Sequence, residues 1–96
     1  MRIAQISPLT ESVPPYQYGG IERIVSYLTE ELVAQGHDVT LFASGDSVSS
    51  SKLVSPCKRA LRLDSCEESQ IYHLLMLEEL CRRSSGFDVI HFHTGY

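Results

Sequence analysis

Apolar residues recur every three or four positions between residues 21 and 33, which is the spacing of one face of an amphipathic helix. The positions that share this face are Ile21, Ile24, Val25, Leu28, Leu32 and Val33. Gly36 follows the last of them, and a glycine in the left-handed conformation commonly ends a helix. The pattern therefore predicts a helix from about Gly20 to Gln35, with Glu22 favourably placed in its first turn.

A second helix is predicted from about Cys66 to Arg83. Its broad apolar face consists of Ile71, Leu74, Leu75, Met76, Leu77 and Leu80. Glu67 and Glu68 suit the first turn of this helix and Arg82 suits the last, because each charge opposes the helix dipole. This charge pattern is explained by helix stability and indicates no function.

Three short apolar runs read as buried strands, at residues 2–6, 39–43 and 88–93. Residues 52–55 fit a short additional strand, and residues 61–63 could form an extended edge. Strand, helix and strand in this order imply a parallel pair with a right-handed crossover. The alternation predicts an α/β fold, a Rossmann-like parallel sheet flanked by helices. The residues expected to form its core are Ile3, Ile6, Ile24, Leu28, Leu32, Val39, Leu41, Leu75, Val89 and Ile90.

The composition describes an ordinary globular chain of 96 residues, enough for one small domain spanning residues 1–96. The net charge of −4 argues against nucleic acid or an anionic membrane as the main partner. No apolar run reaches about 20 residues, so we expect no membrane span, and no secretory signal is visible. Cys57, Cys66 and Cys81 are odd in number and widely spaced, which favours free thiols in a reducing cytoplasm.

Ligands of doubly wound sheets bind beyond the carboxyl ends of the strands, and three segments fall there: residues 7–19, residues 44–46 and residues 93–96. Gly19 and Gly20 precede the first helix, where the absence of Cβ atoms admits a close approach to the backbone. The free N–H groups and positive end of a helix favour an anion, usually phosphate. A tight turn is the alternative explanation of the glycine pair, and no nucleotide-binding fingerprint is present. For residues 44–46 we favour a flexible surface turn over a ligand loop.

His91 and His93 are two positions apart, so on a strand both point to the same side. Histidines at this spacing bind metals in several hydrolases, but no Asp or His follows His93 at a suitable short spacing, so we predict no metal. We expect one histidine to pack against a neighbouring helix and the other, His93, to reach the cleft. His37 and His73 are expected to be surface or structural residues.

Four segments taken together resemble the N-terminal domain of family 4 retaining glycosyltransferases, at residues 1–8, 18–23, 36–46 and 88–93. The resemblance implies a GT-B architecture, two Rossmann-like domains with the active site between them. In that family the N-terminal domain chiefly binds the acceptor, and the C-terminal domain holds most of the nucleotide-sugar donor. No cofactor is expected.

The resemblance also implies roles for individual residues. The glycine pair after the first strand contacts donor phosphate, which maps to Gly19 and Gly20. The histidine that closes the later strand lies near the transferred sugar and maps best to His93, the candidate catalytic residue. His91, the second choice for that position, and Thr94 are candidate substrate-binding residues. Glu22 and Arg23 receive no role.

The 96 residues depart from the family pattern because no C-terminal domain follows. The expectation is an incomplete N-terminal domain of a glycosyltransferase, inactive alone and open to self-association along an exposed sheet edge. Two other readings stay open: a non-catalytic α/β binding or interaction module, and a metal hydrolase that uses His91 and His93.

Overall fold

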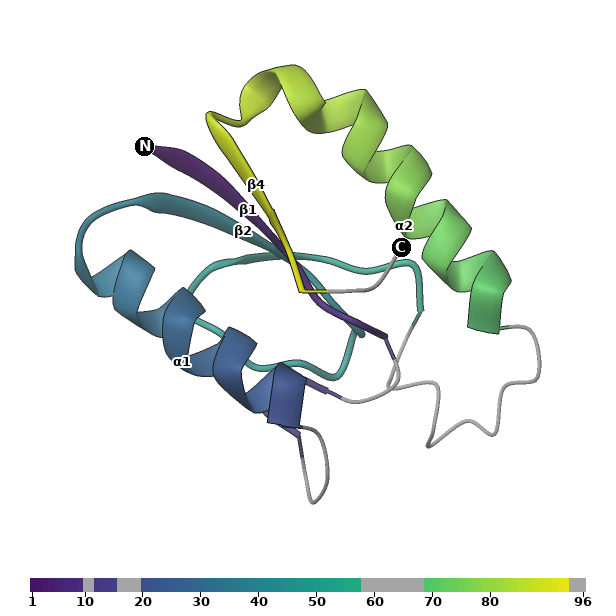
Figure 1. The fold of residues 1–96 in the computed structure, drawn as a ribbon, viewed down its shortest axis with the longest axis horizontal. Helices are drawn as coiled ribbons and strands as arrows, with labels where there is room; N and C mark the ends of the chain where they lie inside the picture. The colour runs from purple at the N-terminus through teal and green to yellow at the C-terminus, as the bar shows by residue number, and fades with distance from the viewer. Residues whose placement is uncertain (10–11, 16–19, 58–68, 94–96) are drawn as a thin grey trace.

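A computed structural model describes residues 1–9, 12–15, 20–57 and 69–93 of the chain (Figure 1). Its elements in chain order are β1 (Arg2–Ile6), α1 (Gly20–Ala34), β2 (Asp38–Phe42), β3 (Lys52–Val54), α2 (Ser69–Arg83), the 3-10 turn η1 (Ser84–Gly86) and β4 (Val89–Phe92). The predicted strands at residues 2–6, 39–43, 52–55 and 88–93 are therefore confirmed to within two residues. The possible edge at 61–63 and the predicted start of the second helix at 66–68 lie outside the described residues.

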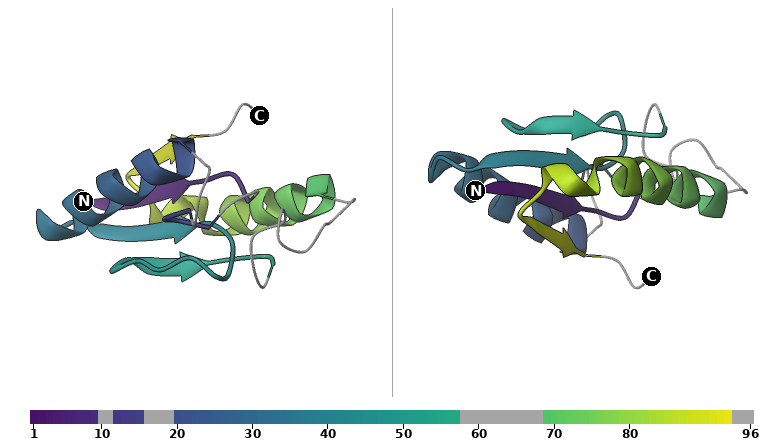
Figure 2. Two further views of the ribbon diagram at one scale, coloured as in Figure 1. Left: turned by 90° about the horizontal axis from the view of Figure 1, so that it is seen from below. Right: turned by 90° about the horizontal axis from the view of Figure 1, so that it is seen from above.

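The four strands form one parallel sheet in the order β3-β2-β1-β4. Gln5 of β1 lies opposite Leu41 of β2 on one side and His91 of β4 on the other. Helices α1 and α2 cover opposite faces of this sheet (Figure 2). The predicted α/β architecture, a parallel sheet with flanking helices, is confirmed.

Side chains alternate between the two faces of each strand, which divides the core in two. The cluster under α2 consists of Ala4, Ile6, Leu9, Phe42, Met76 and Leu80. The smaller cluster under α1 consists of Val13, Val25, Leu41 and Ala43. Each helix has 15 residues, whereas a membrane span needs about 20 apolar ones. Within the described part of the chain, no helix is long and apolar enough to cross a bilayer.

Helix α1 ends at Ala34, just before Gly36, as the glycine at that position predicted. Gly36 has a φ of 92°, and its N–H donates to the Val33 carbonyl at 3.0 Å. The N–H of His37 donates to the Leu32 carbonyl at 3.1 Å. These two bonds form a Schellman motif, which satisfies carbonyl groups at the helix end.

The predicted buried face of α1 is partly wrong, because the helix turns a different part of its surface to the sheet. Its buried residues are Glu22, Val25, Ser26 and Thr29. Ile24 is 62% exposed and Ile21 is 52% exposed, while Leu28 and Leu32 are half-buried. Apolar periodicity marks a wide arc of the helix, and only one edge of that arc meets the sheet.

Four core predictions are confirmed, because Ile3, Ile6, Val39 and Leu41 are all buried. Two others outside α1 are wrong. Leu75 of α2 is 45% exposed and Val89 is 42% exposed. Val89 belongs to β4, which is an edge strand of the described sheet. Ile90 is half-buried against the α2 cluster.

Candidate functional site

The carboxyl ends of β1, β2 and β4 meet at one edge of the sheet. The Ser7 N–H donates to the Phe42 carbonyl at 2.9 Å, and the His93 N–H donates to the Ile6 carbonyl at 2.9 Å. The ladder hydrogen bonds thus continue one residue past the strands and hold His93 beside the end of β1. The parallel strands and the returning helix bring the start of α1 to this same edge (Figure 1).

Gly20 is the first residue of α1, as predicted. A Cβ atom built on it would have no neighbour within 4 Å among the described residues, apart from its adjacent residues and its own helix backbone. None of the described residues therefore occupies the space into which a side chain at this position would project. Gly19 and Thr94, the other predicted contacts at this edge, lie outside the described residues.

His91 and His93 project from the same side of β4. Their ring centroids are 4.1 Å apart, and the ring planes are inclined by 40°. His91 is exposed, whereas His93 is half-buried. Burial lowers the pKa of His93, and the neighbouring His91 lowers that pKa further. The His93 ring is therefore held in its neutral form more firmly than an ordinary histidine.

Sequence reasoning missed the residue that holds His93. Gln5 of β1 is fully buried, and its Oε1 lies 2.8 Å from the Nε2 of His93. The signal was present in the sequence as one polar residue among the apolar residues Ile3, Ala4 and Ile6 of the strand. Its partner is 88 positions away, so the spacing alone could not identify it.

A second polar group lies on the sheet-facing side of α1. Glu22, Ser26 and Thr29 are all buried there, at positions where an apolar face would ordinarily contact a sheet. Sequence reasoning assigned no role to Glu22 and did not single out the other two. Their positions three or four residues apart place them on one face of the helix.

The turn at residues 44–46 begins in the interior and reaches the surface at Gly45, so the prediction of a flexible surface turn is wrong for its first residue. Ser44 is fully buried, and its hydroxyl donates to Asp46 Oδ1 at 2.6 Å. The Gly45 N–H donates to the Cys57 carbonyl at 2.9 Å. Nearby, Ser47 Oγ accepts the N–H of Val13 at 2.9 Å. The last two hydrogen bonds connect this turn to the segments around Cys57 and Val13.

His73 has a structural role, as expected, because its Nε2 accepts the N–H of Leu9 at 3.3 Å. Within the described ranges, no three His, Cys, Asp or Glu side chains gather closely enough to hold a metal ion. Cys57 is half-buried, and Cys81 is an exposed free thiol.

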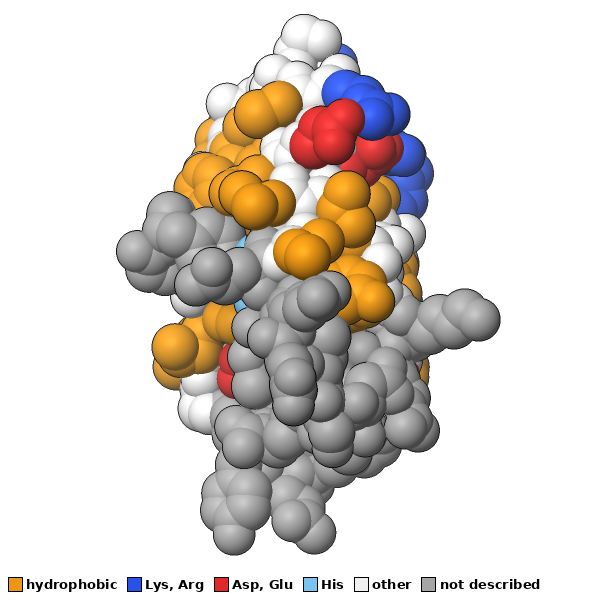
Figure 3. Space-filling view, turned by 90° about the vertical axis from the view of Figure 1, so that its right-hand side faces the viewer, with side chains coloured by type: hydrophobic (Ala, Val, Ile, Leu, Met, Phe, Trp, Pro, Cys, Tyr) orange, Lys and Arg blue, Asp and Glu red, His pale blue; other side chains and the backbone are white. Residues whose placement is uncertain are grey.

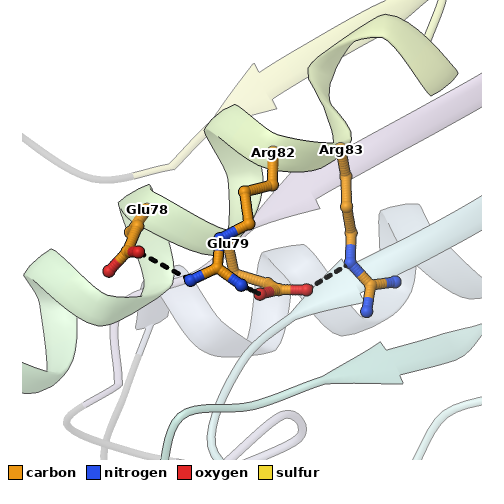
Figure 4. Close-up of polar contacts among 4 residues, drawn as sticks. All are labelled: Glu78, Glu79, Arg82 and Arg83. Carbon is orange, nitrogen blue, oxygen red and sulfur yellow. Dashed lines mark hydrogen bonds and ion pairs between the residues drawn. The ribbon is translucent and has the colours of Figure 1, made fainter.

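A separate hollow of about 400 Å³ lies between α2 and the end of β3. Val54, Pro56 and Leu75 contribute its apolar lining, and Glu78, Glu79, Arg82 and Arg83 its charged lining. The charges are paired with one another: Arg82 lies 2.6 Å from Glu78, and Arg83 lies 2.6 Å from Glu79 (Figure 4).

The paired charges leave this hollow without a clear ligand. The hydrogen bond and charge of Glu78 raise the pKa of Arg82. Hydrophobic side chains lie next to acidic and basic ones on the face drawn in Figure 3. Since the guanidinium groups of Arg82 and Arg83 are each already paired with a carboxylate, the hollow is poorly suited to an anion.

Comparison with known proteins identifies the family and the fold. The sequence profile of Glycosyltransferase Family 4 matches residues 18–96. Among curated proteins, no match to the chain was found. A solved structure that matches is AviGT4, a glycosyltransferase involved in Avilamycin A biosynthesis, with 30% sequence identity and a TM-score of 0.68. The match covers 98% of this chain and 26% of that chain, so these 96 residues correspond to about a quarter of the relative. The fold is that of part of a GT-B glycosyltransferase, and the chain belongs to glycosyltransferase family 4.

Proposed function

We propose that this chain forms part of the N-terminal, acceptor-side domain of a glycosyltransferase, within residues 1–96, that moves a hexosyl group from a nucleotide sugar to an acceptor with retention of anomeric configuration. Family membership and the likeness to AviGT4 support the transfer of a sugar. The observation that supports the proposal is that the start of α1 at Gly20 and the half-buried His93, whose pKa is lowered, lie at the same edge of the sheet, where the strands have their carboxyl ends.

The helix start would bind the phosphate of the donor. The first N–H groups of α1 have no partners inside the helix and carry the positive end of its dipole, which suits a diphosphate. We assign this contact to Gly19 and Gly20. Stabilising the charge that develops on the leaving diphosphate is the largest contribution that such a site makes to the rate.

His93 would contact the transferred sugar, with His91 and Thr94 as further substrate-binding residues. A neutral imidazole presents one N–H donor and one lone pair, so it can hydrogen-bond a sugar hydroxyl without adding a charge. We therefore assign His93 a catalytic role beside the reacting carbon. The donor-binding groups that complete the site would come from a further domain, as about three quarters of AviGT4 has no counterpart in these residues.

We also propose a cytoplasmic location and a tendency to self-associate. The half-buried thiol of Cys57 and the exposed thiol of Cys81 suit a reducing compartment. In the part of the sheet that is described, β4 is an edge strand with Val89 and Phe92 each 42% exposed. An exposed apolar edge is a template for pairing with another strand.

The direct test is to express these residues within their complete reading frame and supply a panel of nucleotide sugars. NMR of the product would report the anomeric configuration through the coupling of the anomeric proton. An α-linked product from an α-linked donor is expected. An inverted product would refute retention, and the absence of both transfer and donor binding across the panel would refute the proposed function.

A further inference from the structure

Gln5 occupies a position in β1 that an aliphatic residue would fill at lower cost. Its neighbours along the strand, Ala4 and Ile6, are fully buried apolar residues, and Gln5 itself is fully buried. Burying a carboxamide is unfavourable unless its polar atoms are hydrogen-bonded. Its oxygen, Oε1, lies 2.8 Å from the Nε2 of His93. The imidazole therefore satisfies the oxygen of this buried carboxamide.

The chemistry of this pair determines which ring nitrogen carries the proton. The carboxamide oxygen can only accept a hydrogen bond, so the Nε2 that faces it must be a donor. The lowered pKa of His93 keeps the ring neutral, and a neutral ring has a single N–H. The remaining nitrogen, Nδ1, then has a free lone pair and can only accept.

We propose that Gln5 is a positioning residue that fixes His93 as the Nε2–H tautomer and leaves Nδ1 as the acceptor for a ligand hydroxyl. The hydroxyl part rests on the proposed function, because it takes a sugar O–H group as the donor. The tautomer part rests on the Gln5–His93 contact alone. In this tautomer His93 accepts a hydrogen bond at Nδ1, so the substrate hydroxyl must be the donor.

The opposite amide orientation gives the opposite prediction. If the Gln5 amide nitrogen faced His93, the ring would accept at Nε2 and carry its proton on Nδ1. In the observed orientation the Gln5 Nε2 has no hydrogen-bond partner among the described residues. The two orientations of the Gln5 amide can therefore be told apart by measurement, because each requires the proton on a different ring nitrogen of His93.

The chain contains a matched control for this measurement. His73 accepts the Leu9 N–H at its Nε2, so a neutral His73 must carry its proton on Nδ1. Two histidines of one small protein are therefore expected in opposite tautomers. A substitution that acts only through general loosening of the fold would change both, whereas loss of the Gln5 carboxamide should change His93 alone.

The experiment is two-bond ¹H–¹⁵N NMR of the 96-residue chain with ¹⁵N-labelled histidine, at about pH 8.5 so that the rings are neutral. His93→Asn and His73→Asn assign the two signals. The expected wild-type result is Nε2–H for His93 and Nδ1–H for His73. In Gln5→Met the His93 signals should shift toward a mixture of tautomers, with His73 unchanged. Gln5→Glu, which restores an acceptor, should restore Nε2–H.

An Nδ1–H ring at His93 in the wild-type chain would overturn the proposal, as would an unchanged tautomer in a folded Gln5→Met variant. If Gln5→Met does not fold, the wild-type and Gln5→Glu spectra decide the question, because Nδ1–H in either of them contradicts it. Failure of the complete enzyme to transfer a sugar would refute the proposed function and leave the tautomer result unaffected.

Discussion

The carboxylate of Asp88 holds the amino end of β4 against Arg2 at the start of β1. Asp88 Oδ2 accepts the Arg2 backbone N–H at 2.8 Å, and Oδ1 lies 3.4 Å from the Arg2 guanidinium. In return, the Asp88 N–H donates to the Arg2 carbonyl at 2.7 Å. Strand β4 is thus fastened to β1 at both ends, by Asp88 before it and by His93 after it.

We predict that Asp88→Asn destabilises the chain and that the effect depends on pH. The backbone hydrogen bond from Arg2, followed by its side-chain hydrogen bond, lowers the pKa of Asp88. A lowered carboxyl pKa gives stability that is present above its unfolded value and is lost as pH falls through the folded value. The melting temperature of the variant should be lower than that of the wild type at neutral pH, and the two should converge in acid.

Asp38→Asn is the matched control for Asp88→Asn. Asp38 lies at the start of β2 and pairs with Lys52 at 3.3 Å, with both side chains more than half exposed. Exposed ion pairs contribute little to stability. Thermal unfolding followed by circular dichroism should therefore show a smaller change than in Asp88→Asn, and equal changes would contradict the role given to the Arg2 contact.

Stability should also fall on mild acidification because of His93. Burial, with His91 as a second cause, lowers the pKa of His93, so the unfolded chain binds a proton at a higher pH than the folded chain. The stabilising contribution is complete above the unfolded pKa of about 6.5 and decreases as pH falls below it. Urea unfolding at several values between about pH 8 and pH 5 should show this loss in the wild type and a smaller one in His93→Asn.

In the complete enzyme, Gly20→Val should lower kcat/KM at least about tenfold, equivalent to about 1.4 kcal/mol of transition-state stabilisation. The physical reason is that a side chain at this position would occupy the open space at the N-terminus of α1, where donor phosphate is proposed to bind. Calorimetry with the donor should show weaker binding in parallel.

Gly86→Val provides the control for that substitution. A Cβ atom added at Gly86 in η1 would likewise have no described neighbour within 4 Å, apart from the adjacent residues and the local backbone. Gly86, however, lies just before the amino end of β4, away from the carboxyl ends of the strands. Both variants should fold. Wild-type rates in Gly20→Val, or an equal loss in Gly86→Val, would remove the argument for an anion site at the start of α1.

The 96-residue chain alone should show no transferase activity and should self-associate through β4. Sedimentation velocity is expected to detect concentration-dependent dimers or larger species. A double variant, Val89→Lys with Phe92→Lys, should reduce association, because charged side chains on both faces of an edge strand disfavour pairing. Val48→Lys changes a 76%-exposed residue in a loop and should leave association unchanged. A monodisperse wild-type monomer that transfers sugar unaided would contradict both expectations.

Local signals predicted the elements of this fold well. The end of α1 followed from Gly36, because only a glycine adopts a φ of 92° at low cost. The strands followed from short apolar runs. The orientation of α1 did not follow: Ile24 is exposed while Thr29 is buried, since periodicity defines an apolar arc but not the part of it that contacts the sheet.

The candidate site was predictable only in part. His91 and His93 lie on one side of β4 because alternate residues of a strand always do so. The contact between Gln5 and His93 depends on the register of β1 against β4, which pairs Gln5 with His91. That register is a long-range property of the fold, so a single polar residue in β1 had no visible partner in the sequence.

The position of β1 between β2 and β4 has a consequence for synthesis on the ribosome. Strand β2 ends at Phe42 and β4 ends at Phe92, a separation of roughly 50 residues, which at about 5–20 residues per second takes roughly 3–10 s to translate. During that interval β1 can pair with β2, but its other edge has no native partner. Nascent chains of this protein should therefore be substrates for ribosome-associated chaperones until residues 89–92 emerge from the exit tunnel.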